Sequence, residues 1–112
     1  MFSTLTVLSV FFQFITAGTM FPDDGLKEAH EAGALVLHVL SFLAVAAAAW
    51  HWRKTSGPLW PTVLAGVLFV LTFIQPLTGQ RDLLEYHIPG AMILSVGAVW
   101  VMVWSFGRAA RT

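Results

Sequence analysis

The feature that most constrains this chain is a series of long apolar stretches that contain neither lysine nor arginine. Four stretches, residues 3–20, 31–52, 59–77 and 86–106, alternate with short segments rich in glycine, proline and polar residues. A helix that crosses the bilayer core needs about 20 mostly apolar residues, and backbone amides cannot face lipid unpaired. Because short loops join antiparallel neighbours, we expect an all-α, integral membrane four-helix bundle, built from two tandem helical hairpins in a single domain of residues 1–112.

The composition of the chain excludes several classes of protein. Hydrophobic residues make up 57% of the chain and charged residues 11%, whereas about a quarter of the residues in ordinary soluble proteins are charged. Lysine plus arginine and aspartate plus glutamate number six each, so no basic surplus exists to attract a nucleic acid. The absence of cysteine removes disulfides, iron–sulfur clusters, thiolate metal sites and covalently attached haem. We therefore expect a membrane protein that does not bind nucleic acid.

Charged residues are segregated between the two ends of the expected bundle. One end collects every acidic residue together with Lys27 and Arg81, and the other end carries only basic residues. The acidic residues are Asp23, Asp24, Glu28, Glu31, Asp82 and Glu85, and the basic residues of the other end are Arg53, Lys54, Arg108 and Arg111. Because lysine and arginine in short loops stay on the cytoplasmic side, we expect both termini to be cytoplasmic.

The tryptophans agree with this orientation. Each lies near the basic end of its stretch, where a belt of indole rings at the membrane interface is common; they are Trp50, Trp52, Trp60, Trp100 and Trp104. The first stretch lacks the basic flank of a signal peptide, so we expect it to be retained as a helix. The chain is expected to be a multi-pass protein of the cell membrane, namely the plasma membrane of a bacterium.

A sequence repeat relates the second stretch to the fourth. The motif H-x-x-G-A-x-x-L begins at His30 and again at His87, and a weaker motif, F-x-Q-x-x-T, begins at Phe11 and again at Phe73. Duplicated hairpins are common in small membrane folds. The topology brings His30 and His87 to one depth at the acidic end.

The repeat predicts a cofactor site. Residues three and four positions after a helical residue share its face, and these positions hold only small residues: Gly33, Ala34, Gly90 and Ala91. Two imidazoles with small residues beside them match the needs of a haem held by two histidines. We expect His30 and His87 to ligate the iron of one b-type haem. The alternatives are that both histidines cap helix starts in water and that the glycines serve close helix packing.

Histidine pairs on alternate helices resemble the four-helix membrane cytochrome b class. The order of His30, the Q-P-L-T-G segment that begins at Gln75, and His87 is also similar to small four-helix bacterial integral membrane proteins of a domain-of-unknown-function family. The resemblance runs from about Thr16 onward and implies b-type haem and electron transfer, with His30 and His87 as ligands. Many such cytochromes stack two haems across the membrane, whereas this sequence has no second matching pair at its basic end.

Other polar residues within the stretches leave alternatives open. His38, roughly 12 Å deeper than His30 by helix rise, is an alternative ligand, a proton carrier or a structural imidazole, and its repeat equivalent is Ser95. His51 is most simply an interfacial anchor between two tryptophans. Four further residues either bond across helices, the role we favour, or line a quinone headgroup site: Gln13, Thr16, Gln75 and Thr78.

The sequence therefore predicts a small haem b membrane protein that takes part in electron transfer, with the haem near the outer face. We expect such a chain to be an electron-transfer protein or a subunit of an oxidoreductase, and whether it is itself an enzyme stays open. Its expected partners are the lipid bilayer and a quinone or a membrane redox protein, with a homo-oligomer or a larger complex both open. The alternative is a cofactor-free accessory or assembly subunit of a larger membrane complex.

The predicted orientation can be tested with two single-cysteine variants, Ser56→Cys and Gln80→Cys, in a chain that has no native cysteine. Gln80 lies in an acidic-end loop and Ser56 follows Arg53 and Lys54, so an impermeant thiol reagent on intact cells should label Q80C and spare S56C. Labelling of S56C without Q80C would contradict the assignment.

Overall fold

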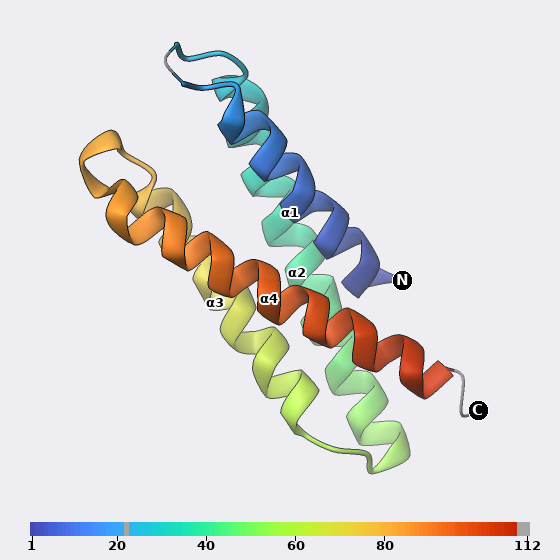
Figure 1. Cartoon of the computed structure of the whole chain (residues 1–112). Helices are drawn as coiled ribbons and strands as arrows, with labels where there is room; N and C mark the ends of the chain where they lie inside the picture. Colours follow the sequence, from blue (N-terminus) through green and yellow to red (C-terminus); the bar gives the residue numbers. More distant parts are fainter. Residues whose placement is uncertain (22, 110–112) are drawn as a thin grey trace.

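The computed structural model describes residues 1–21 and 23–109, and within this part every regular element is helical. The elements are α1 (Phe2–Gly18), α2 (Lys27–Thr55), α3 (Trp60–Thr78), the short 3-10 helix η1 (Arg81–Leu83) and α4 (Leu84–Ala109) (Figure 1). The predicted all-α fold is confirmed, and each long helix contains most of one predicted apolar stretch. Arg111, assigned above to the basic residues, lies outside the described residues.

The helix α2 and the turn that follows it show how local chemistry sets the helix ends. Glu28 in the first turn and Arg53 in the last turn complement the helix dipole. Ser56 then adopts a left-handed conformation with φ of 48°, and Pro58 cannot continue the helix. Pro61 lies in the first turn of α3, where its missing amide costs nothing.

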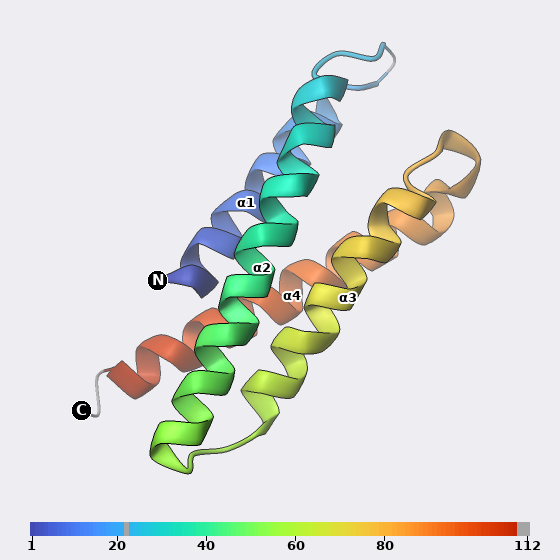
Figure 2. The same cartoon turned by 180° about the vertical axis from the view of Figure 1, so that it is seen from behind.

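The four long helices form a closed ring. The helix α1 packs on α2, α2 on α3, α3 on α4, and α4 returns to α1, so α2 and α4 lie diagonally opposite each other. The hairpins α1–α2 and α3–α4 separate toward the end that carries their connecting loops, as Figures 1 and 2 both show. We call this end, which carries the six acidic residues, the acidic end. The opposite end, with Arg53, Lys54 and Arg108, is the basic end.

The two loops of the acidic end are joined by an ion pair. The Nη2 atom of Arg81 lies 3.3 Å from Oδ1 of Asp24, and both side chains are exposed. Exposed pairs of this kind contribute at most about 1 kcal/mol. The separation of the hairpins is therefore set by the packing of the helices below and not by this contact.

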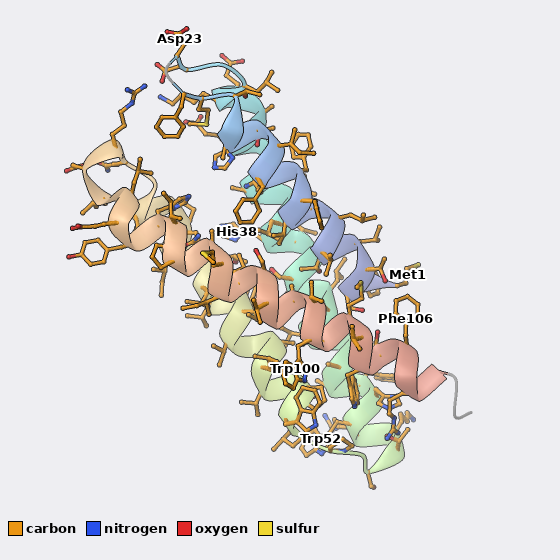
Figure 3. All side chains as sticks on the ribbon, viewed as in Figure 1. Met1, Asp23, His38, Trp52, Trp100 and Phe106 are labelled. Atoms are coloured by element: carbon orange, nitrogen blue, oxygen red, sulfur yellow. The ribbon has the colours of Figure 1, made fainter. Side chains whose placement is uncertain are left out.

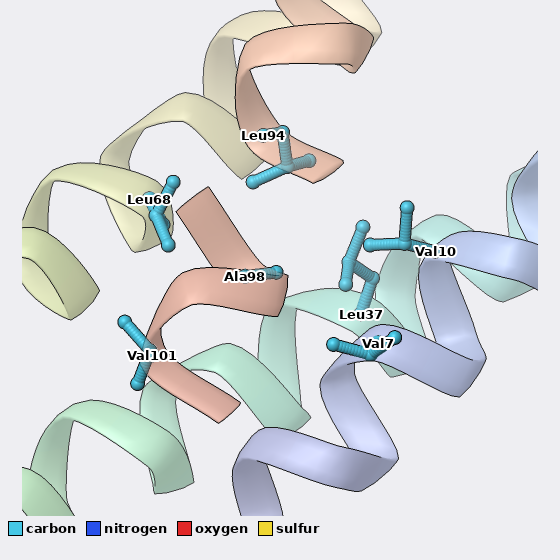
Figure 4. Close-up of a cluster of buried hydrophobic side chains, with 7 residues drawn as sticks. All are labelled: Val7, Val10, Leu37, Leu68, Leu94, Ala98 and Val101. Atoms are coloured by element: carbon cyan, nitrogen blue, oxygen red, sulfur yellow. The ribbon is translucent and has the colours of Figure 1, made fainter. Parts of the chain in front are cut away.

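Large apolar side chains are exposed on the outside of the bundle, among them Trp100 and Phe106 (Figure 3). The buried apolar cluster is modest and comprises Val7, Val10, Leu37, Leu68, Leu94, Ala98 and Val101 (Figure 4). Six hydroxyl residues are buried beside it: Ser3, Thr6, Ser9, Thr16, Ser41 and Thr72. Several of these hydroxyls donate to carbonyl oxygens one turn earlier in their own helix, which satisfies them without water. The many large apolar side chains exposed on the outside distinguish this bundle from a water-soluble protein, in which large exposed apolar patches are uncommon.

Three helices are long and apolar enough to cross a membrane, by length and composition: α2, α3 and α4, the last together with η1. The helix α1 is apolar but shorter, with 17 residues. The bundle extends 48 Å along its longest axis, compared with about 40–45 Å for a bilayer and its headgroup regions. These features are compatible with a multi-pass membrane protein.

Candidate functional site

The predicted histidine pair comes together at the acidic end of the bundle. His30 in the first turn of α2 and His87 in the first turn of α4 face each other across the diagonal of the helix ring. Their ring centroids are 6.5 Å apart and their ring planes differ by 63°. Both side chains are half-buried. Two residues separated by 57 positions in sequence thus share one depth, as the repeat predicts.

In the first hairpin, His30 is anchored to the preceding helix. Its Nδ1 atom lies 3.1 Å from the backbone carbonyl oxygen of Gln13 and 3.0 Å from Oγ1 of Thr16. The Thr16 hydroxyl donates its own proton to helical carbonyl oxygens, so its oxygen is the acceptor toward His30. Because a carbonyl oxygen can only accept, the Nδ1 atom of His30 carries the proton.

The second hairpin repeats this arrangement. Nδ1 of His87 lies 2.8 Å from the carbonyl oxygen of Gln75 and 3.4 Å from Oγ1 of Thr78. Gln75 belongs to the last turn of α3, where carbonyl oxygens lack helical partners, so the imidazole also caps that helix. The pattern of Gln and Thr three residues apart, paired with a histidine of the next helix, therefore occurs twice in three dimensions.

These contacts decide the tautomer of both histidines in their neutral form. With the proton on Nδ1 and donated to a backbone carbonyl, Nε2 keeps its lone pair as the one ring nitrogen able to bind a metal. A metal-binding histidine usually donates its other ring nitrogen in this way, which fixes the orientation of the ring. The site therefore holds two oriented imidazoles, one from each hairpin, and in the neutral form the Nε2 atom of each is unprotonated.

The small residues beside the histidines have a packing partner that the sequence analysis did not assign. A Cβ atom at Gly33 would lie 2.7 Å from Oε1 of Gln13, and one at Gly90 would lie 2.5 Å from Oε1 of Gln75. Each glycine therefore makes room for the glutamine that anchors the histidine of its own hairpin. Ala34 and Ala91 follow these glycines and are half-buried.

The two glutamines differ in one respect. The Nε2 atom of Gln75 donates to the carbonyl oxygen of His87 at 3.1 Å, which ties α3 to the first turn of α4. The Oε1 atom of Gln13 is buried without a hydrogen-bond partner among the described residues. The first hairpin therefore keeps one unused acceptor next to His30.

His38 belongs to the contact between α2 and α3. Its Nδ1 atom lies 2.6 Å from Oγ1 of Thr72, which in turn donates to the carbonyl oxygen of Phe69, and its ring stacks on Phe73 with centroids 4.2 Å apart. The Thr72 oxygen is thus an acceptor, and Nδ1 of His38 carries the proton in the neutral form. This geometry gives His38 a structural partner within the bundle, while its repeat equivalent, Ser95, donates to the carbonyl oxygen of Ala91 in its own helix.

From the sequence, Gln13, Thr16, Gln75 and Thr78 are expected to bond across helices or to line a quinone site, with no link to the histidines. The structure shows that they anchor His30 and His87. The signal that could have revealed this was present, because the motif F-x-Q-x-x-T precedes each H-x-x-G motif in the repeat. Whether the glutamine and threonine of this motif reach the histidine depends on the rotation of each helix about its own axis, which the repeat alone does not fix.

Comparisons with known proteins add no relative: no family model matches the chain, and neither the curated proteins nor the solved structures contain a significant match. In the described part of the chain, no group of three or more histidine, cysteine, aspartate or glutamate side chains is placed to hold a metal ion. A metal at the histidine pair would need its remaining ligands from elsewhere.

The anchoring contacts predict the tautomers of three histidines. In haem-free protein labelled with ¹⁵N in histidine, at a pH about two units above the ordinary histidine pKa of about 6.5, His30, His38 and His87 should carry the proton on Nδ1. Nitrogen NMR shifts report this directly, and single histidine substitutions assign the signals.

The variant Thr16→Val serves as the control for this experiment. It removes the hydroxyl but leaves the carbonyl oxygen of Gln13, which is the obligatory acceptor, so His30 should keep its tautomer. A proton found on Nε2 of His30 or His87 in the wild-type chain would show that the anchoring geometry is wrong.

Proposed function

We propose that this chain is a membrane protein that holds one b-type haem between His30 and His87 and takes part in single-electron transfer. The observation that supports the proposal is the facing histidine pair, with centroids 6.5 Å apart and both Nδ1 atoms donated to backbone carbonyl oxygens. Without those bonds, two histidines near an interface are ordinary capping residues. With them, the free Nε2 atoms form a matched pair of ligands.

The residues present fit a haem better than a bare metal ion. The ring centroids of His30 and His87 are 6.5 Å apart, close enough that both imidazoles would be able to bind one metal. A porphyrin supplies four nitrogen ligands of its own, so two protein ligands complete the iron, whereas no third ligand stands beside the pair in the described part of the chain. The absence of cysteine excludes the thioether attachment of a c-type haem, and the haem proposed here is the non-covalent b-type.

The protein's own contribution to such a site is orientation. The haem, when bound, supplies a one-electron redox couple. The carbonyl oxygens of Gln13 and Gln75 hold the Nδ1 protons, which makes each imidazole a stronger donor through Nε2. Because each histidine is anchored within its own hairpin, His30 and His87 would hold a haem jointly, at the end of the bundle where the hairpins separate (Figure 1).

The environment supports placement in a membrane. Three helices are long and apolar enough to span it, and many large apolar side chains are exposed on the outside of the bundle. We propose that all four helices form a membrane-embedded bundle with both termini in the cytoplasm, since the basic residues gather at that end. The histidine pair then lies near the outer face, within reach of a quinone or of a redox partner outside the membrane.

One observation favours the alternative of a cofactor-free accessory subunit. The space beside Gly33 and Gly90 is taken by glutamine side chains, so the glycines have a packing role that needs no cofactor. In that case the histidines serve only to join α1 to α2 and α3 to α4. The two functions differ in whether the Nε2 atoms of His30 and His87 bind a haem iron.

Absorption spectra of the purified protein, oxidised and then reduced, separate these functions. The wild-type chain should carry one low-spin haem, and His30→Ala or His87→Ala should abolish that spectrum, because a single imidazole leaves the iron five-coordinate or releases the haem. His38→Gln is the matched control, since His38 is bonded to Thr72, and its spectrum and haem content should stay nearly unchanged.

Two outcomes would overturn the proposal. The first is wild-type protein that purifies folded from haem-sufficient cells with no Soret band and acquires none when haem is added, which would favour the accessory subunit. The second is loss of haem in His38→Gln with retention in His30→Ala, which would redraw the ligand pair as His38 with His87. Helicity and monodispersity must be measured for each variant alongside the spectra.

A further inference from the structure

A second feature of the bundle is a pocket at its basic end, far from the histidine pair. It has a volume of about 220 Å³ and lies where α1, α2 and α4 meet. One part of its wall is polar and consists of Ser3, His51, Ser105 and Arg108. The other part is apolar and includes Ala44, Ala47, Ala48 and Val101. The pocket is therefore amphipathic.

The charge at this pocket is not neutralised by the chain. Arg108 lies over the ring of Trp104, with its guanidinium carbon 5.8 Å from the ring centroid, and it forms no ion pair with a carboxylate in the described part of the chain. Arg53 and Lys54 add two more positive charges nearby, while every acidic side chain is at the opposite end. An anion is the ligand that this end of the bundle favours.

His51 provides a second polar group that lacks a partner. Its Nε2 atom is buried and makes no hydrogen bond within the described residues, and its ring meets Trp104 edge-on with centroids 5.8 Å apart. A buried polar atom without a partner is costly, and an oxygen of a bound ligand would satisfy it. From the sequence, His51 is expected to be an interfacial anchor, and no pattern in the sequence indicates this pocket.

The apolar wall distinguishes a lipid from a free anion. Ala44, Ala47 and Ala48 precede His51 at helical spacing, so they form one smooth strip of α2 leading away from the polar groups. A strip of small side chains accommodates an alkyl chain but offers nothing to inorganic phosphate. Basic pockets between helices on the cytoplasmic side are known sites for anionic lipid headgroups.

We propose that this pocket binds one anionic phospholipid, with its phosphate at Arg108 and His51 and one acyl chain along the alanine strip. The inference rests on the membrane insertion proposed above but not on the haem. The lipid phosphate would neutralise positive charge at the basic end, which the acidic side chains cannot do because they lie at the opposite end of the bundle.

Native mass spectrometry of the protein, released from nanodiscs that contain equal amounts of phosphatidylglycerol and phosphatidylcholine, tests the proposal. The wild-type chain should retain phosphatidylglycerol preferentially, and Arg108→Gln should reduce that preference about fivefold, the effect expected for one basic charge near an anionic lipid. Arg53→Gln removes an equal charge that does not line the pocket and should have a much smaller effect.

A second variant keeps every charge and fills the apolar wall. Ala47→Leu should lower phosphatidylglycerol retention while leaving Arg108 and His51 in place, so the test does not depend on the folding of one variant. In detergent, phosphatidylglycerol should raise the melting temperature of the wild-type chain, and inorganic phosphate should not.

Three results would overturn the lipid site. They are equal retention by Arg108→Gln and Arg53→Gln, undiminished retention by Ala47→Leu, and stabilisation by inorganic phosphate as large as that by the lipid. The haem spectrum distinguishes a failure here from a failure of the proposed function, because Arg108→Gln should leave it unchanged.

Discussion

The bond on which this structure depends is the one from a histidine Nδ1 atom to a backbone carbonyl oxygen of the preceding helix. It occurs twice, from His30 to Gln13 and from His87 to Gln75, at 3.1 and 2.8 Å. Each bond ties the first turn of one helix to the last part of its hairpin partner. The same bond sets the tautomer and leaves Nε2 free. A contact that stabilises the hairpin thus also orients an imidazole and keeps the lone pair of its Nε2 atom available.

The repeat explains why this contact is paired with glycine. A glutamine can lie against the neighbouring helix only where that helix has no side chain, and Gly33 and Gly90 provide that space. The duplicated unit is therefore a hairpin with four coupled positions, namely glutamine, threonine, histidine and glycine. Two such hairpins in a closed ring place their histidines across the diagonal from each other, so neither hairpin alone can make the pair.

Much of the fold could be predicted from the sequence because each apolar stretch has about the length that a membrane-spanning helix requires. The stretch at 31–52 became α2 over Lys27–Thr55, longer at both ends because helical hydrogen bonds continue into the polar flanks. The convergence of His30 and His87 also followed from the topology. The role of Gln13 and Gln75 did not, since it depends on the rotation of each helix about its axis. The pocket at Arg108 depends on where α1 begins relative to α2 and α4, which no local pattern encodes.

The central claim is that two histidine nitrogens, one from each hairpin, bind the same iron. Hyperfine spectroscopy of the oxidised, haem-loaded protein tests it most directly when ¹⁵N is placed only in histidine, because only nitrogens bonded to the iron show strong coupling to its unpaired electron. Two strongly coupled histidine nitrogens are expected in the wild-type spectrum, and His30→Ala and His87→Ala should each abolish the low-spin signal. A wild-type spectrum with one coupled histidine nitrogen, or with none, would contradict the claim.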